Sequence, residues 1–179
     1  MNSVADDARS EPPLRGDEIT TLLAFLDYQR ATLAGKCGNL DSAGLNTAVA
    51  PSTMTLGGLL KHLACVEEWW FHQVLRGAAS TPPWDTVDWE SDRDWDWHSA
   101  ARDHPEALRS LWHDTVVQSR ADVAQALREA GLSQVALGVP GDREAPSLRW
   151  IVCHMIEEYA RHNGHADLIR EAIDGQTGE

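Results

Sequence analysis

The stretch HMIEEYARHNGHADLIRE, residues 154–171, places His154, Glu158 and His162 four residues apart in a run with helical periodicity. In an α-helix, residues four apart lie one turn above another on the same face. One stripe of this helix is apolar except at Glu158 and His162; it comprises Ile151, Met155, Glu158, His162, Ala166, Ile169 and Ile173. Burying an unpaired carboxylate or imidazole costs free energy. A bound cation is one reason for such a pair to face a core.

The overall composition suits one domain with a sizeable core, since 42% of the 179 residues are hydrophobic and 24% are charged. The formal net charge of −13 argues against general nucleic-acid binding and against docking on an anionic membrane, because both surfaces would repel the chain. Eight tryptophans are many for this length, and we expect them to cluster at packing sites or around a pocket.

Cysteine usage favours a reducing cytoplasm. The three cysteines, Cys37, Cys65 and Cys153, are scattered and form no C-x-x-C pair. Cys65 and Cys153 are expected to be packing residues. The acidic N-terminal segment does not read as a signal peptide, and no stretch approaches the roughly 20 apolar residues of a membrane span.

Helical periodicity predicts an all-α four-helix bundle. The expected helices cover residues 17–36, 56–75, 105–130 and 147–174. Asp17, Thr55 and Ser147 are the expected N-caps, and Gly175 is the expected stop of the last helix.

Two segments break this pattern. Residues 1–16, rich in charge, Ser and Pro, are expected to form a disordered tail that precedes one domain over 17–179. Residues 77–104 combine Pro82 and Pro83 with four tryptophans and many aspartates, which predicts one long loop between the second and third helices. Loops of this length are often functional.

The spacing on the last helix leaves three candidate ligand pairs: His154/Glu158, Glu158/His162 and His162/His165. A third ligand must come from another helix, and His62 lies at the edge of the apolar arc of the second helix. Three ligands from two helices would leave a coordination position open, as in catalytic metal sites. The alternative is that these are ordinary polar residues on the margin of a helix face. Glu67 is expected to form a helix-surface or interhelical salt bridge.

The chain resembles the DinB-like superfamily of metal-binding four-helix bundles. It is most similar to the actinobacterial branch that contains mycothiol-dependent S-transferases. The stretches that carry the resemblance are LDYQRATL (26–33), TLGGLLKHLACVEEWWF (55–71) and SLRWIVCHMIEEYARHNGHADLIREAIDG (147–175).

The resemblance implies a metal triad of His62, Glu158 and His162. Glu158 departs from the commoner His/His pair of the family's fourth helix and matches a Glu/His variant within the superfamily. His154 and His165 then become candidates for residues beside the ligands or on the substrate side. Zn is the metal favoured here, while the donor set also suits Ni, Fe or Mn.

The expected function is transfer of a thiol to an electrophilic small molecule through a metal-bound thiolate, with mycothiol as the thiol that the resemblance implies. No side chain is expected to form a covalent intermediate. Two alternatives stay open: a hydrolase that uses metal-activated water, and a non-enzymatic, metal-stabilised bundle that dimerises and binds a partner through the Trp-rich loop. The sequence is compatible with a homodimer.

Overall fold

A computed structural model describes residues 9–139 and 144–177 of the chain. Its longer elements follow the chain as α1 (Glu18–Cys37), α3 (Leu56–Glu67) with its π-helical continuation η1 (Glu68–Leu75), α5 (Pro105–Ala130) and α6 (Leu148–Asp174). Its short elements are α2 (Ser42–Leu45), η2 (Trp84–Thr86), α4 (Trp95–Ala100) and η3 (Gly131–Ser133).

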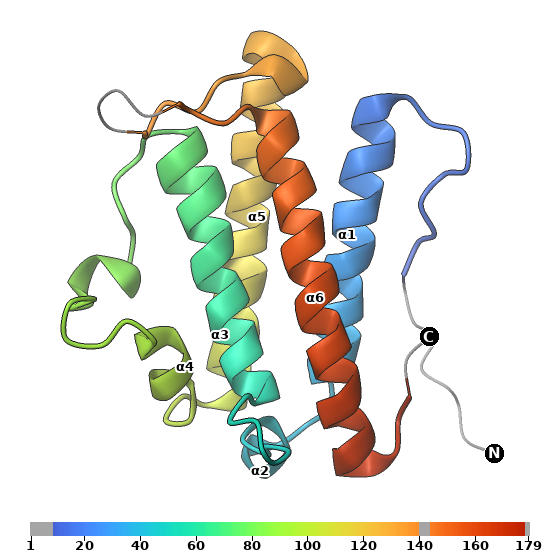
Figure 1. Cartoon of the computed structure of the whole chain (residues 1–179), viewed down its shortest axis with the longest axis vertical. Coiled ribbons are helices and arrows are strands. Elements are labelled where there is room, and N and C mark those ends of the chain that lie inside the picture. The colour runs from blue at the N-terminus through green and yellow to red at the C-terminus, as the bar shows by residue number, and fades with distance from the viewer. Residues whose placement is uncertain (1–8, 140–143, 178–179) are drawn as a thin grey trace.

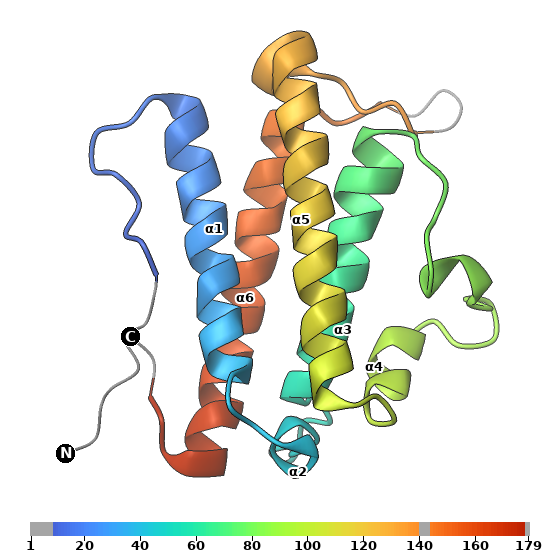
Figure 2. The same ribbon diagram turned by 180° about the vertical axis from the view of Figure 1, so that it is seen from behind.

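The four long helical segments pack as a bundle (Figure 1). Helix α6 lies against α1 on one side and α3 on the other, and α3 with η1 packs against α5. Seen from behind, α5 and α1 cover the opposite side of the bundle (Figure 2). Within the described ranges the chain forms no strand, only an isolated bridge between Val135 and Ser147. The all-α prediction is therefore confirmed.

Three of these helices begin at the predicted N-cap residues. Asp17 accepts a hydrogen bond from the Thr20 amide at 2.7 Å, and the Thr55 hydroxyl accepts one from the Gly58 amide at 3.0 Å. Ser147 accepts from the amide of Trp150 at 3.3 Å. Each bond satisfies an amide that has no partner within its own helix. At the other end of α6, Gly175 takes the left-handed backbone conformation, with φ of 78°.

The second long helix is not α-helical throughout. From Glu68 to Leu75 it continues as a π-helix, whose hydrogen bonds span five residues instead of four. The wider turn changes which residues of this segment face the bundle core. Phe71 and Leu75 are fully buried in η1, whereas Trp70 is only partly buried.

The prediction of one long loop over residues 77–104 needs correction, because the segment contains η2 and α4. Aromatic packing provides the physical reason: the rings of Trp84 and Trp89 each meet Trp95 edge-on, at 6.1 and 6.4 Å. Helix α4 packs on α3. A Cβ on Gly58 would lie 2.7 Å from the Trp97 ring, so the glycine permits this close approach.

Of the predicted disordered tail, residues 1–8 lie outside the described residues. Residues 9–16 contain a turn and no helix. The Arg9 side chain contacts α1, with a hydrogen bond of 3.3 Å to the Thr32 hydroxyl and its guanidinium over the Tyr28 ring. The division into a tail and a domain over 17–179 stays a prediction.

Candidate metal centre

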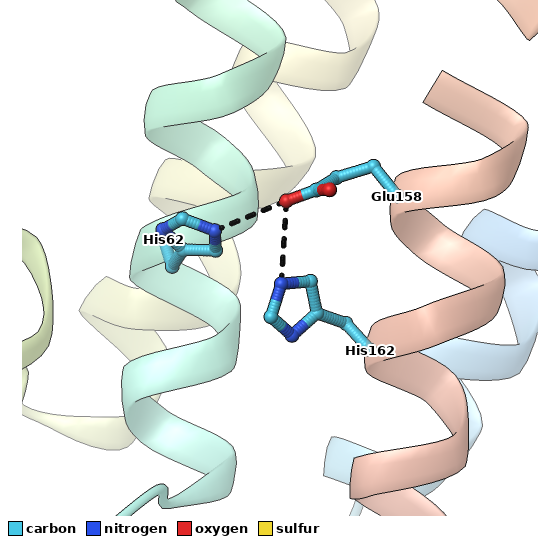
Figure 3. A group of neighbouring side chains, drawn as sticks. All are labelled: His62, Glu158 and His162. Atoms are coloured by element: carbon cyan, nitrogen blue, oxygen red, sulfur yellow. Dashed lines mark hydrogen bonds and ion pairs between the residues drawn. The ribbon is translucent and has the colours of Figure 1, made fainter. Parts of the chain in front are cut away.

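Three predicted ligand residues converge between α3 and α6. His62 comes from α3, whereas Glu158 and His162 lie one turn apart on α6 (Figure 3). Glu158 Oε1 lies 3.4 Å from His62 Nε2 and 3.2 Å from His162 Nε2. One ligand atom from each residue lies within 4.8 Å of the other two. Among the described residues this is the one group of three or more His, Cys, Asp or Glu side chains that meets that spacing.

The spacing of the donor atoms fits a small divalent cation. Zn-type bonds of about 2.0–2.2 Å in a tetrahedral site place neighbouring ligand atoms about 3.3–3.6 Å apart. The two separations at Glu158 Oε1, 3.4 and 3.2 Å, lie close to this edge length. Two imidazoles and one carboxylate are also a donor set that Zn and its neighbours accept.

Asp96 orients His62. Its Oδ2 lies 2.8 Å from His62 Nδ1, so that a proton on Nδ1 is donated to the carboxylate and Nε2 is left to face Glu158. The indole of Trp97 stacks on the His62 ring, with centroids 4.6 Å apart. Both partners lie on α4. Sequence reasoning missed Asp96, because nothing in a run of aspartates and tryptophans marks which carboxylate folds back onto α3.

The two remaining histidine candidates have different positions. His165 Nδ1 lies 3.3 Å from His162 Nδ1, on the side of that ring opposite the Glu158 contact. The His154 ring instead stacks on Trp150 at 5.2 Å and meets Trp70 at 4.9 Å. His165 therefore adjoins the three converging residues, and His154 belongs to an aromatic cluster further along α6.

The electrostatics keep Glu158 ionised. Hydrogen bonds from His162 and His62 hold the pKa of its carboxyl far below the usual range, in spite of partial burial. Burial acts to lower the pKa of His62, but hydrogen bonds to Asp96 and Glu158 outweigh burial and raise it. Glu158 is thus a carboxylate at neutral pH, which is the form that binds cations.

A family comparison identifies the chain. The family model described as Mycothiol-S-transferase matches residues 21–175, which include all four long helical segments apart from the first residues of α1. The chain belongs to the mycothiol-S-transferase family.

Family membership confirms the resemblance drawn from the three sequence stretches. No curated protein matches the chain. In the part of the chain that the structure describes, none of the helices is long and apolar enough to cross a membrane.

The cysteines of this mycothiol-S-transferase family member lie outside the triad. Cys37 is buried, Cys65 is partly buried, and all three are free thiols. Burial, aided by the nearby carboxylates of Asp96 and Glu68, raises the pKa of Cys65 to about 12. Cys153, expected in the core, is exposed, because it lies on the face of α6 that points away from the bundle interior.

Glu67, expected to form a helix-surface or interhelical salt bridge, forms an interhelical ion pair in the core. Its carboxylate accepts two hydrogen bonds of 2.7 Å from the Arg30 guanidinium and one of 2.8 Å from the Tyr159 hydroxyl. Tyr159 in turn accepts a hydrogen bond from the Trp112 indole at 2.9 Å. Since Tyr159 follows Glu158 directly, the network fixes the rotation of α6 that points Glu158 at His62.

Proposed function

We propose that this protein transfers a low-molecular-weight thiol, mycothiol, to an electrophilic small molecule at a divalent metal held by His62, Glu158 and His162. The observation that carries the proposal is the convergence of three ligand atoms, from two helices, within 4.8 Å of one another. Membership of the mycothiol-S-transferase family supports the choice of thiol and of reaction. Zn suits the donor set, as do Ni, Fe and Mn.

The proposed ligands set the charge of the site and leave it open to a substrate. Two neutral imidazoles and one carboxylate leave a divalent ion with net positive charge and leave one coordination position for a substrate. When bound, such an ion would lower the pKa of a thiol and so favour its nucleophilic, ionised form. Asp96 holds the ring of His62 in the orientation that ligation needs.

The chain's own cysteines are poor candidates for the nucleophile. Cys153 is exposed on the face of α6 that points away from the bundle interior. The raised pKa of Cys65, about 12, keeps its thiol protonated at neutral pH. Cys37 is fully buried and has a pKa raised to about 12. An external thiol is therefore the better source of the attacking sulfur. Such thiols stay reduced in the cytoplasm, and we place the reaction there.

The test is a conjugation assay with monochlorobimane, whose fluorescence rises when a thiol displaces its chloride. We expect product only when both mycothiol and the metal-loaded protein are present, and loss of product after dialysis against a chelator. The variant His62→Ala should lose activity, whereas His113→Ala, an exposed histidine on α5, should retain it. Metal-dependent consumption of substrate without any thiol would contradict the proposal and favour the hydrolase.

A further inference from the structure

The ring of His162 has a partner at each of its two nitrogens. Nε2 lies 3.2 Å from Oε1 of Glu158, within the triad between α3 and α6. The other ring nitrogen, Nδ1, points away from Glu158 (Figure 3) and lies 3.3 Å from Nδ1 of His165. His162 is only 8% exposed, so its neighbours in the protein, more than solvent, set the orientation of this ring and the nitrogen that carries its proton.

The helix itself brings His165 to this position. It follows His162 by three residues on α6, and residues three apart are neighbours on the surface of a helix. The two ring centroids lie 5.2 Å apart with the planes at 67°, so the rings meet edge to face. His165 is only partly buried. The contact therefore depends on the local geometry of one helix and not on a distant loop.

This geometry argues against His165 as a further ligand of the same ion. The two nitrogens of an imidazole point in different directions, and His165 meets the one that faces away from the triad. A cation bound to Nε2 of His162 would lie on the far side of the ring from His165. The pair His162/His165, one of the three ligand pairs that the sequence spacing allowed, is better explained as a hydrogen bond between two side chains.

The chemistry of ligation requires an acceptor at this position. An imidazole that binds a cation through Nε2 uses the lone pair there and carries its proton on Nδ1. For His62 the acceptor is the Asp96 carboxylate, 2.8 Å from Nδ1. For His162 the group at the equivalent nitrogen is Nδ1 of His165, which offers a lone pair when the proton of that neutral ring is on Nε2.

We propose that His165 is the positioning residue of His162: its Nδ1 accepts the Nδ1 proton of His162 and keeps Nε2 of His162 free for a cation. The inference rests on the metal centre of the proposed function. It also separates the two histidines that the sequence left as equal candidates beside the ligands, because His154 contacts Trp70 and Trp150 instead.

Zn affinity tests this role apart from turnover. His165→Leu removes the acceptor and should lower Zn affinity by about 10–100-fold, the usual effect of losing a residue that orients a ligand. His165→Asn has nearly the same shape as leucine, but its amide oxygen takes the place of Nδ1 and accepts the same proton. We therefore expect His165→Asn to bind Zn within about threefold of wild type. Competition with a chromogenic chelator measures both affinities.

The matched control is His154→Leu, which replaces a histidine of the same helix that packs on tryptophans, and it should leave Zn affinity within about twofold of wild type. His165→Ala adds no apolar surface and should show the same loss as His165→Leu, so a folding defect of one variant does not decide the result. Far-UV circular dichroism of each metal-free variant checks the fold.

The visible spectrum of the cobalt-loaded protein gives a signature that lost stability alone would not produce. Co²⁺ accepts the same donors as Zn²⁺, and its absorption bands report the geometry of the ligands. The bands should shift in His165→Leu and match wild type in His165→Asn. Equal affinities and spectra for His165→Leu and His154→Leu would overturn the inference, as would a His165→Asn variant as weak as His165→Leu. Loss of binding as complete as in His62→Ala would make His165 a ligand and overturn it too.

The positioning role and the reaction can fail separately. If His165→Leu loses Zn affinity while the wild-type protein conjugates no thiol, the proposed transfer is wrong and the role of His165 stands. If thiol transfer proceeds and His165→Leu binds Zn as tightly as wild type, the transfer stands and the role given to His165 is wrong.

Discussion

The hydrogen bond between Asp96 and His62 joins α4 to the candidate metal centre. Asp96 is 5% exposed, and its carboxylate meets the nitrogen of His62 that faces away from Glu158. A carboxylate in this position fixes the ring orientation of a ligand histidine and raises its basicity. The same contact with His62 also explains why a short helix is held against α3 in a segment otherwise rich in turns.

Removing Asp96 should weaken metal binding without removing a ligand. We expect Asp96→Ala to lower Zn affinity by about 10–100-fold, the usual effect of losing such a partner. Asp96→Asn should lower Zn affinity less, because its amide oxygen still accepts the hydrogen bond from His62. Competition with a chromogenic chelator measures the affinity. Asp94→Ala, an exposed neighbour without a side-chain capping bond, is the control; equal affinities for Asp94→Ala and Asp96→Ala would argue against the role given to Asp96.

Loss of a metal ligand should weaken metal binding more than loss of Asp96. His62→Ala should abolish most metal binding while helical content stays close to wild type, because the core is supplied by apolar side chains and not by the triad. Elemental analysis of the purified variant and far-UV circular dichroism measure the two quantities. Full metal occupancy in His62→Ala would mean that another residue takes its place.

Cys65 offers a test of where the nucleophile resides. Its pKa of about 12 leaves almost no thiolate at neutral pH, so Cys65→Ser should keep most of the conjugation activity. The measurement is the mycothiol-dependent rate at equal metal content. Abolished activity in a folded, metal-loaded Cys65→Ser protein would show that the chain carries its own nucleophile.

At the scale of the elements, local signals in the sequence predicted more than long-range ones. Asp17, Thr55 and Ser147 act within three residues of their own helices, and each cap was found where the sequence placed it. The periodicity made His62 and Glu158 candidates, since His62 lies at the edge of one apolar arc and Glu158 interrupts another, but it left three ligand pairs open, and the family resemblance supplied the choice of triad. The π-helix over residues 68–75 could not be predicted, since a π-helical turn is not marked by any particular residue type.

The contact of α4 with α3 depends on tertiary packing that a sequence pattern does not express. Trp97 lies over Gly58, and the Lys61 ammonium lies 4.4 Å from the centroid of the Trp95 ring. The ion pair of Lys61 with Asp103 adds a further link, at 2.5 Å. Tertiary contacts of this kind distinguish a helix from a loop in a stretch with Pro82, four tryptophans and many aspartates.

Gly58→Ala tests that packing. The new Cβ would lie 2.7 Å from Cε3 of Trp97, whose ring is itself stacked on His62, so the indole cannot move freely. We expect the variant to unfold at a lower temperature, since overpacking costs about 1–3 kcal/mol and exceeds the gain of up to about 1 kcal/mol in helix propensity. Gly164→Ala on α6, with nothing within 4 Å, should instead be neutral or stabilising. A higher melting temperature for Gly58→Ala than for Gly164→Ala would contradict the close approach of Trp97 to Gly58.

For the whole molecule, one buried ion pair links three of the long helices. Arg30 on α1 meets Glu67 at the end of α3, and Tyr159 on α6 donates to the same carboxylate. The Arg30 and Glu67 side chains are 5% and 0% exposed. A charge so deeply buried is tolerated only while its partner is present, and removal of one member leaves the other without compensation.

Arg30→Met should therefore destabilise the fold by about 3–5 kcal/mol, because Glu67 would remain buried with the Tyr159 hydroxyl as its hydrogen-bond donor. Arg120→Met is the control: this arginine pairs with Asp27, which Arg30 also contacts at 3.0 Å, but the Arg120 side chain is 51% exposed, so its loss should cost at most about 1 kcal/mol. Urea unfolding monitored by circular dichroism gives both values. Because Tyr159 adjoins Glu158, Arg30→Met should also weaken Zn binding under native conditions, whereas Arg120→Met should not. Similar losses of stability in the two variants would show that the buried pair does not hold the helices in register.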